Sequence, residues 1–196
     1  HNMCQLSTRM KIYEAQETNR KCMPLLPIIA RLDGRCFSKF TKNMDRPYDK
    51  RLTKTMQETT ICLLEETGAD IGYTQSDEIS LVWINDSASS QVFFNGKIQK
   101  MVSILASICS VYFNKLGNNN MPGVMVNKTP VFDCRVYQAP NLMEAYNALI
   151  WREQDAIRNS VQSYASVFFS HKECFKKSCK QLKEMLLSKG KDWNDY

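Results

Sequence analysis

The sequence has no apolar run close to the roughly 20 residues that a membrane-spanning helix requires. Its longest apolar stretches, such as residues 25–30, are as short as a strand. Only seven glycines and six prolines occur among 196 residues, which excludes collagen-like and low-complexity classes. The single internal histidine, His171, leaves no Ser-His-Asp constellation for nucleophilic catalysis. At 43% hydrophobic residues, the chain is expected to form one globular domain with its own core.

Targeting signals are also missing from the sequence. Nothing at the N-terminus resembles a signal peptide, and we interpret His1 and Asn2 as an expression remnant. The eight cysteines are scattered, and several lie within apolar periodic stretches. This pattern favours reduced thiols in a cytoplasmic protein with no membrane partner. A zinc site at His171, Cys174 and Cys179 is disfavoured because no CxxC pair and no fourth ligand lie nearby.

Charge is unevenly distributed along the chain. Residues 31–54 contain eight basic and three acidic side chains, and residues 172–191 contain seven lysines and two glutamates. Because the whole chain carries a net charge of only +6, the remainder is net acidic. Two basic segments on an acidic body favour binding to polyphosphate or to a nucleic-acid backbone. Solvated helix faces would give the same lysine runs, and the sequence leaves that alternative open.

Hydrophobic periodicity predicts the order strand, helix, strand, strand, helix, strand. The predicted strands cover residues 25–32, 69–74, 78–84 and 131–138, and the predicted helices cover residues 49–66 and 94–116. Residues 117–123 are predicted to form a loop, and two further helices are expected at 142–168 and 177–189. This order is typical of the ferredoxin-like βαββαβ fold. We therefore predict an α+β protein, with a palm-like domain at residues 10–140 and a helical extension at 141–196.

Two acidic residues fall at the predicted strand ends. Asp33 ends the first strand, and Asp77 lies at the tip of the predicted hairpin. In a βαββαβ sheet the first strand neighbours this hairpin, so the two carboxylates are expected to meet at one end of the sheet. Such carboxylates, together with phosphate oxygens, are typical Mg²⁺ ligands, and two ions can assist an in-line displacement. Each motif alone is ordinary turn chemistry, but their combination within a basic segment favours a catalytic site.

The residues around Asp33 suit a triphosphate. Gly34 allows close approach of the backbone, and its carbonyl is a further hard ligand. The backbone N–H groups of the next four residues are expected to face phosphates; these residues are Arg35, Cys36, Phe37 and Ser38. Arg31, Lys39 and Arg46 are expected to offset the remaining phosphate charge, and Ser76 to hydrogen-bond a phosphate or ribose.

Polar side chains follow one face of the predicted helix at 142–168. They are Arg152, Asp155, Arg158, Asn159, Gln162 and Ser163. Either a solvent-exposed face or a surface for a second nucleotide or an RNA end explains this stripe equally well.

Four ordered segments resemble motifs of the tRNA-His guanylyltransferase family, whose members add nucleotides in the 3′–5′ direction. They read RLDGRCF from residue 31, GYTQSDEIS from 72, FDCRV from 132 and WREQD from 151. The resemblance covers residues 10–196. It implies a polymerase-type palm with two Mg²⁺ ions held by Asp33, the Gly34 carbonyl and Asp77, and ATP or GTP as substrates. It also implies triphosphate contacts from residues 33–38 and around Ser76.

Other positions match family residues that contact a nucleotide or an RNA 5′-end. They are Arg31, Arg46, Asp49, Arg135 and Lys172, and Asn159 is assigned to the same 5′-end or second-nucleotide site. Where eukaryotic members carry His-Ile-Asn-Asn, this chain reads Ile157-Arg-Asn-Ser. That difference resembles the bacterial and archaeal branch, which repairs truncated tRNA 5′-ends on a template.

The resemblance further implies tRNA as the partner, a homotetramer built as a dimer of dimers, and a longer C-terminal tail beyond Tyr196. Two alternatives use a similar sheet: a nucleotidyl cyclase acting on free NTP, and a non-catalytic RNA-binding module. The second is disfavoured because the strands lack the Gly-Phe segment with stacking aromatics that such modules carry.

Overall fold

The computed structural model describes residues 2–46 and 48–195, with the side chains of residues 2–4 left aside. The interpretation of His1 as an expression remnant and the tail expected after Tyr196 therefore lie outside the described residues. The strands are β1 (Ile28–Gly34), β2 (Ile71–Gln75), β3 (Glu78–Trp83) and β4 (Phe132–Gln138). They form one antiparallel sheet in the order β2-β3-β1-β4, which confirms the ferredoxin-like prediction.

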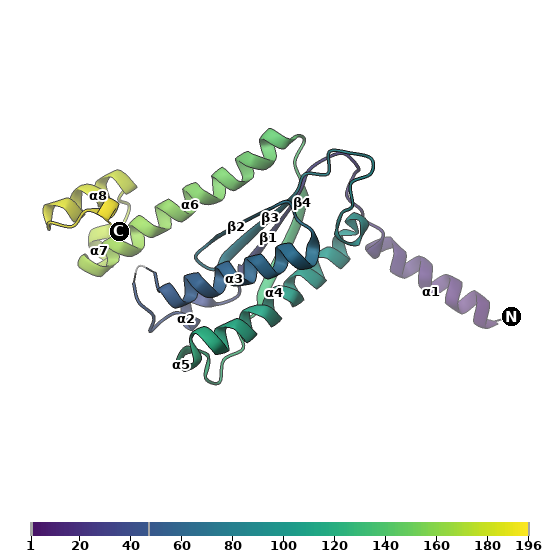
Figure 1. Cartoon of the computed structure of the whole chain (residues 1–196), viewed down its shortest axis with the longest axis horizontal. Coiled ribbons are helices and arrows are strands. Elements are labelled where there is room, and N and C mark those ends of the chain that lie inside the picture. The colour runs from purple at the N-terminus through teal and green to yellow at the C-terminus, as the bar shows by residue number, and fades with distance from the viewer. Residues whose placement is uncertain (1, 47, 196) are drawn as a thin grey trace.

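Two long helices cover one face of this sheet (Figure 1). They are α3 (Lys50–Thr67) and α4 (Ile98–Asn120). Alternate β1 residues, Ile28, Ala30 and Leu32, are buried in the main core with side chains from both helices. Phe37 also lies in this core, in an aromatic cluster with Phe40, Phe113 and Phe132.

The other face of the sheet is only partly covered. The helix α6 (Leu142–Phe168) has the bounds that the sequence predicts and begins at an Asn141 cap. Its first turns pack on the sheet through Ala145, in a small core with Ile29 and Val82. Towards the end of β1 the same face carries Arg31 and Asp33 instead of apolar residues. This polar half of the face is where a functional site fits.

The remaining elements are helical. They are α1 (Asn2–Thr18), α2 (Phe37–Phe40), α5 (Pro122–Met125), α7 (His171–Cys174), α8 (Cys179–Ser188) and the 3-10 helices η1 (Phe93–Gly96) and η2 (Trp193–Asp195). Figure 1 shows α1 projecting away from the domain at one end and α7 and α8 at the other end of α6. Val161, Ala165, Leu182 and Leu186 join α6 to α8. No helix within the described ranges has both the length and the apolar character needed to cross a membrane.

Two predictions of local structure are wrong, and one helix was missed. The second helix does not include residue 94, because Phe94 and Asn95 adopt left-handed backbone angles before α4 begins at Ile98. The predicted loop at 117–123 is instead the last turn of α4 followed by α5. A Cβ at Gly117 would lie 3.1 Å from the Met125 sulfur, so this glycine lets α5 fold back against α4. The helix α1 was not predicted at all.

Candidate active site

Asp33 and Asp77 come together at one end of the sheet, as their positions in the sequence predict. The antiparallel register pairs Asp33 with Glu78, the residue after Asp77. The backbone N–H of Gly34 donates to the carbonyl of Asp77 at 2.9 Å, which ties the hairpin tip to the end of β1. The two-residue tip is tight, and Ser76 adopts a φ of 55° to make it.

Two further acidic residues surround this pair, and the sequence analysis did not single them out. Glu78 and Asp133 lie opposite Asp33 on its two neighbouring strands, so all three share one face of the sheet. The sequence could have indicated the position of Asp133, because this residue alternates with the apolar residues Phe132 and Cys134 and so lies on the opposite face of the strand. Four carboxylates thus lie at this end of the sheet, although no three of them in the described part of the chain are grouped closely enough to hold a metal ion by themselves.

The electrostatics of the pair reflect this crowding. The pKa of Asp77 is raised to about 6, mainly by burial and also by the neighbouring carboxylates Asp33, Glu78 and Asp133, while its own backbone hydrogen bond acts in the opposite direction. Burial also raises the pKa of Asp33, although the guanidinium of Arg31 opposes this. Among the described residues no ion pair involves Asp77. Oxygen ligands with uncompensated negative charge suit a hard divalent cation.

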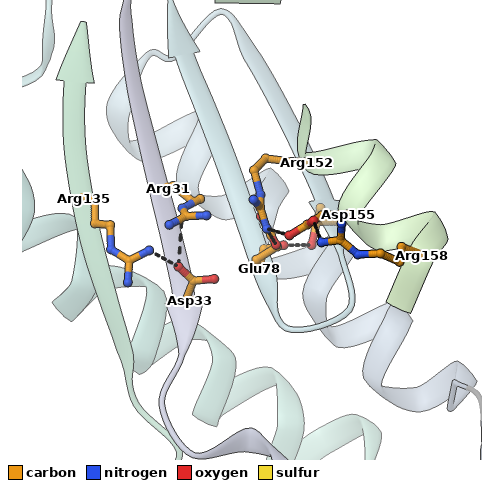
Figure 2. A network of polar contacts seen from close by, with 8 residues as sticks. Arg31, Asp33, Glu78, Arg135, Arg152, Asp155 and Arg158 are labelled. Carbon is orange, nitrogen blue, oxygen red and sulfur yellow. Dashed lines mark hydrogen bonds and ion pairs between the residues drawn. The ribbon is translucent and has the colours of Figure 1, made fainter. Parts of the chain in front are cut away.

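Two arginines flank Asp33 on the open face (Figure 2). Arg31 Nε lies 3.7 Å and Arg135 Nη1 lies 3.5 Å from the same oxygen, Oδ2. Both contacts are long for hydrogen bonds, and most donors of each guanidinium have no acceptor among the described residues. Arg31 and Arg135 thus lie beside the carboxylates, and their contact with an RNA 5′-end or a second nucleotide stays a prediction.

Glu78 is held by a third arginine, which belongs to α6. Arg152 is buried and donates to both carboxylate oxygens of Glu78, at 2.9 and 2.7 Å, and to Asp155 at 3.0 Å. Arg158 pairs with the other oxygen of Asp155. Figure 2 shows this chain of contacts running from the sheet to the helix. The polar stripe on α6 is therefore partly structural, since two of its members fix the helix on the hairpin.

The loop after β1 fits a phosphate site with one correction. The N–H of Arg35 does not face the site, because it donates to the carbonyl of Val131 at 2.8 Å and so continues the pairing of β1 with the β4 side. The N–H groups of the next three residues have no protein acceptor among the described residues; these residues are Cys36, Phe37 and Ser38. The Phe37 side chain is committed to the core, so only its backbone can contact a ligand.

The remaining predicted residues lie outside the strand ends that carry these carboxylates. Arg46 is exposed in the segment before α3, Asn159 is exposed on α6, and Lys172 is exposed on α7. Asp49 is buried and caps α3: it accepts from the backbone and the side chain of Arg51, and from the N–H of Asp45. These bonds hold the pKa of Asp49 well below its usual range, so its carboxylate is structural, and contact with a nucleotide stays a prediction.

A ferredoxin-like sheet with carboxylates at its central strand ends and arginines beside them defines a palm-type domain for nucleotide chemistry. The sequence profile described as tRNAHis guanylyltransferase matches residues 7–140. The chain belongs to this family.

Individual relatives agree with this assignment. A protein of Acanthamoeba polyphaga mimivirus, R259, is 36% identical over 84% of this chain and 63% of its own length. A tRNA(His) guanylyltransferase of Schizosaccharomyces pombe is 28% identical over 79% of this chain and 58% of its own length. The chain thus spans about half to two thirds of these curated relatives.

Solved structures are similar over more of the chain. A bacterial Thg1-like protein in complex with ATP superimposes with a TM-score of 0.90 at 33% identity, over 97% of this chain and 83% of the other. The complex of such a protein with GTP gives 0.81 at 31% identity, over 98% and 79%.

Proposed function

We propose that this protein is a Mg²⁺-dependent nucleotidyltransferase that adds nucleotides in the 3′–5′ direction to the 5′-end of tRNA. The observation that carries the proposal is the junction of Asp33 and Asp77, joined through the Gly34 backbone hydrogen bond. Membership of the family and similarity to ATP- and GTP-bound relatives support it. The proposal includes templated repair of 5′-truncated tRNA as well as G addition to tRNA-His.

The donor set fits the implied metal. Asp33, Asp77 and the Gly34 carbonyl offer hard oxygen ligands, and substrate phosphates would supply others; no three acidic, histidine or cysteine side chains in the described ranges form a metal cluster by themselves. Two Mg²⁺ ions bound there would lower the pKa of an attacking hydroxyl and stabilise the leaving group.

The reaction needs no side-chain nucleophile. A 5′-monophosphate end would first react with ATP to give an adenylylated end and pyrophosphate. The 3′-hydroxyl of an incoming NTP would then attack the 5′-phosphate and release AMP, whereas a 5′-triphosphate end would release pyrophosphate directly. Arg31 and Arg135 would hold the phosphate beside Asp33 and offset the charge that develops on it. The free N–H groups after Arg35 would orient the triphosphate of the NTP.

Replacing Asp77 tests this proposal. We expect Asp77→Ala to abolish nucleotide addition to a 5′-truncated, 5′-triphosphorylated tRNA, because one of two metal-binding carboxylates is lost. Binding of the tRNA, measured by filter retention, should stay within about twofold. The exposed Asp86→Asn is the matched control and should keep full activity.

Full addition activity of Asp77→Ala would refute the metal assignment. The same assay without RNA, on labelled ATP or GTP, separates the transferase from a cyclase, because only a cyclase converts the free nucleotide to a cyclic product.

Two other properties belong to the proposal. The family resemblance leads us to propose a homotetramer, and α1 offers exposed apolar side chains, among them Leu6, Met10 and Tyr13, for contact between subunits. A cytoplasmic location fits the seven cysteines in the described part of the chain, all of which are free thiols.

A further inference from the structure

The Trp151 side chain on α6 lies beside the polar half of the sheet, and the proposed chemistry gives it no part. Its ring contacts two guanidinium groups: the Cζ atom of Arg152 lies 4.3 Å and that of Arg31 lies 5.2 Å from the ring centre. Both distances fall within the range of cation–π attraction. Trp151 is 49% exposed and belongs to none of the buried apolar clusters, so contact with these two cations, and not core packing, explains its place.

The two arginines are held to very different degrees. Arg152 donates to both oxygens of Glu78 and to Asp155, and its side chain is almost fully buried. In the described part of the chain, the one ion pair of Arg31 is the 3.7 Å contact with Asp33. A long side chain with one weak polar contact keeps much of its rotamer freedom. The place of the Arg31 guanidinium therefore depends on its other neighbour, the ring.

These contacts form a closed series. Asp33 and Glu78 lie directly opposite each other on β1 and β3, and each carries its own arginine (Figure 2). The ring of Trp151 contacts both arginines and so completes the series on the side of α6. Because Arg152 is fixed by hydrogen bonds, the ring packed against it offers Arg31 a support of fixed position. Without the ring, Arg31 is free to turn from Asp33 towards solvent.

We propose that Trp151 is a positioning residue that holds the Arg31 guanidinium beside Asp33. The ring touches no reacting group and acts through the arginine alone. The effect on catalysis rests on the proposed function, in which Arg31 offsets phosphate charge. The positioning itself is a property of the protein without substrate, so it is measured without any reaction.

Labelling of arginines with phenylglyoxal, followed by mass spectrometry, measures the positioning in the full chain. Trp151→Leu should raise the labelling rate of Arg31 about fivefold, because a cation–π contact of ordinary strength is lost. Labelling of Arg152 and Arg135 should stay within twofold, since hydrogen bonds hold the first and the second is already exposed. Loosening of the whole helix would instead expose Arg152 as well, so the pattern separates positioning from a general structural role.

Nucleotide addition provides the second measurement. At saturating tRNA and NTP, Trp151→Leu should lower kcat about tenfold, with a thermal unfolding midpoint close to that of the wild type. Trp151→Phe keeps an aromatic face and should recover both the protection of Arg31 and most of the rate. Tyr146→Leu is the matched control: this tyrosine is also exposed on α6, and no guanidinium contacts its ring in the described ranges. It should change neither the labelling nor the rate.

Unchanged labelling of Arg31 in Trp151→Leu, equal gains in the labelling of Arg31 and Arg152, or a failure of Trp151→Phe to restore protection would overturn the inference. The two proposals fail separately. Addition by the wild type together with unchanged labelling in Trp151→Leu rejects only the positioning role. The expected labelling pattern in a protein that adds no nucleotide rejects only the transferase.

Discussion

Gly34 lies where no side chain fits. A Cβ there would come within 2.4 Å of the Phe37 ring, and that ring is buried among three other phenylalanines. The absence of a side chain at Gly34 therefore lets the turn after β1 fold over the aromatic cluster and brings the backbone next to Asp77. The lack of a Cβ at Gly34 therefore connects the packing of the aromatic core with the geometry of the candidate metal site.

Gly34→Ala should destabilise the protein by about 1–3 kcal/mol, the usual cost of overpacking a core. Urea unfolding followed by circular dichroism measures this, and addition activity should fall as well because the Asp33 to Asp77 junction is displaced. Gly123→Ala is the control, since a Cβ there meets nothing within 4 Å and the position is helical. Equal stability of the two variants would contradict this account.

At the scale of elements, α6 and the β2–β3 hairpin are coupled through one buried arginine. Arg152 satisfies both oxygens of Glu78, and Glu78 directly follows Asp77 at the hairpin tip. The helix therefore does more than cover the sheet: it orients the strand end that carries a candidate metal ligand. In the site, Arg152 is a positioning residue.

Arg152→Ala should lower the free energy of unfolding by about 3 kcal/mol, because it leaves Glu78 partly buried and unpaired. Arg158→Ala removes a more exposed partner of Asp155 and should cost under about 1 kcal/mol. Denaturant unfolding distinguishes the two. A positioning role further predicts that Arg152→Lys, which keeps the charge but loses the paired geometry, recovers stability better than addition activity.

The elements also show how far the sequence leads. Strand order and the bounds of α6 follow from periodicity, since each strand and the long helix have one clear apolar side. Two features could not be predicted from local periodicity, because they depend on packing against distant residues. They are the turn at Phe94 and Asn95 and the continuation of α4 through Gly117. The helix α1 escaped prediction because its apolar residues form no buried face.

The candidate site, like the fold, was only partly predictable from the sequence. Asp33 and Asp77 were found because topology alone brings strand ends together. Three other contacts depend on strand register and on the direction of side chains. They are the pairing of Glu78 with Arg152, the pairing of Asp49 with Arg51, and the hydrogen bond from the Arg35 N–H to the Val131 carbonyl. Those contacts were visible only in three dimensions.

At the scale of the molecule, the two basic segments lie on different parts of the fold. The first surrounds the end of β1 and the start of α3, and the second covers α7 and α8 at the far end of α6 (Figure 1). A nucleic acid that reaches the acidic site from the helical end would meet both. The extension is thus expected to contribute to binding of the RNA backbone rather than to chemistry.

Replacing Lys176, Lys177 and Lys180 by glutamine should weaken tRNA binding and lower the slope of log K against log salt by up to about 0.9 for each lost contact with the duplex. Addition to saturating tRNA should change little. Three exposed lysines outside the segment, Lys97, Lys100 and Lys115, are the matched control and should leave the slope unchanged. An identical slope in both triple variants would assign the second segment to the solvated surface.

The hydrogen bond from Gly34 to Asp77 has a consequence for assembly. The spacing of the Asp33 and Asp77 carboxylates is set by the backbone pairing of β1 with β3 rather than by flexible side chains. A shift of one residue in that pairing would turn Asp33 towards the phenylalanine cluster and Leu32 towards solvent. Errors in the site are thus also errors in folding, so quality control that recognises exposed core would remove defective catalysts without ever testing their activity.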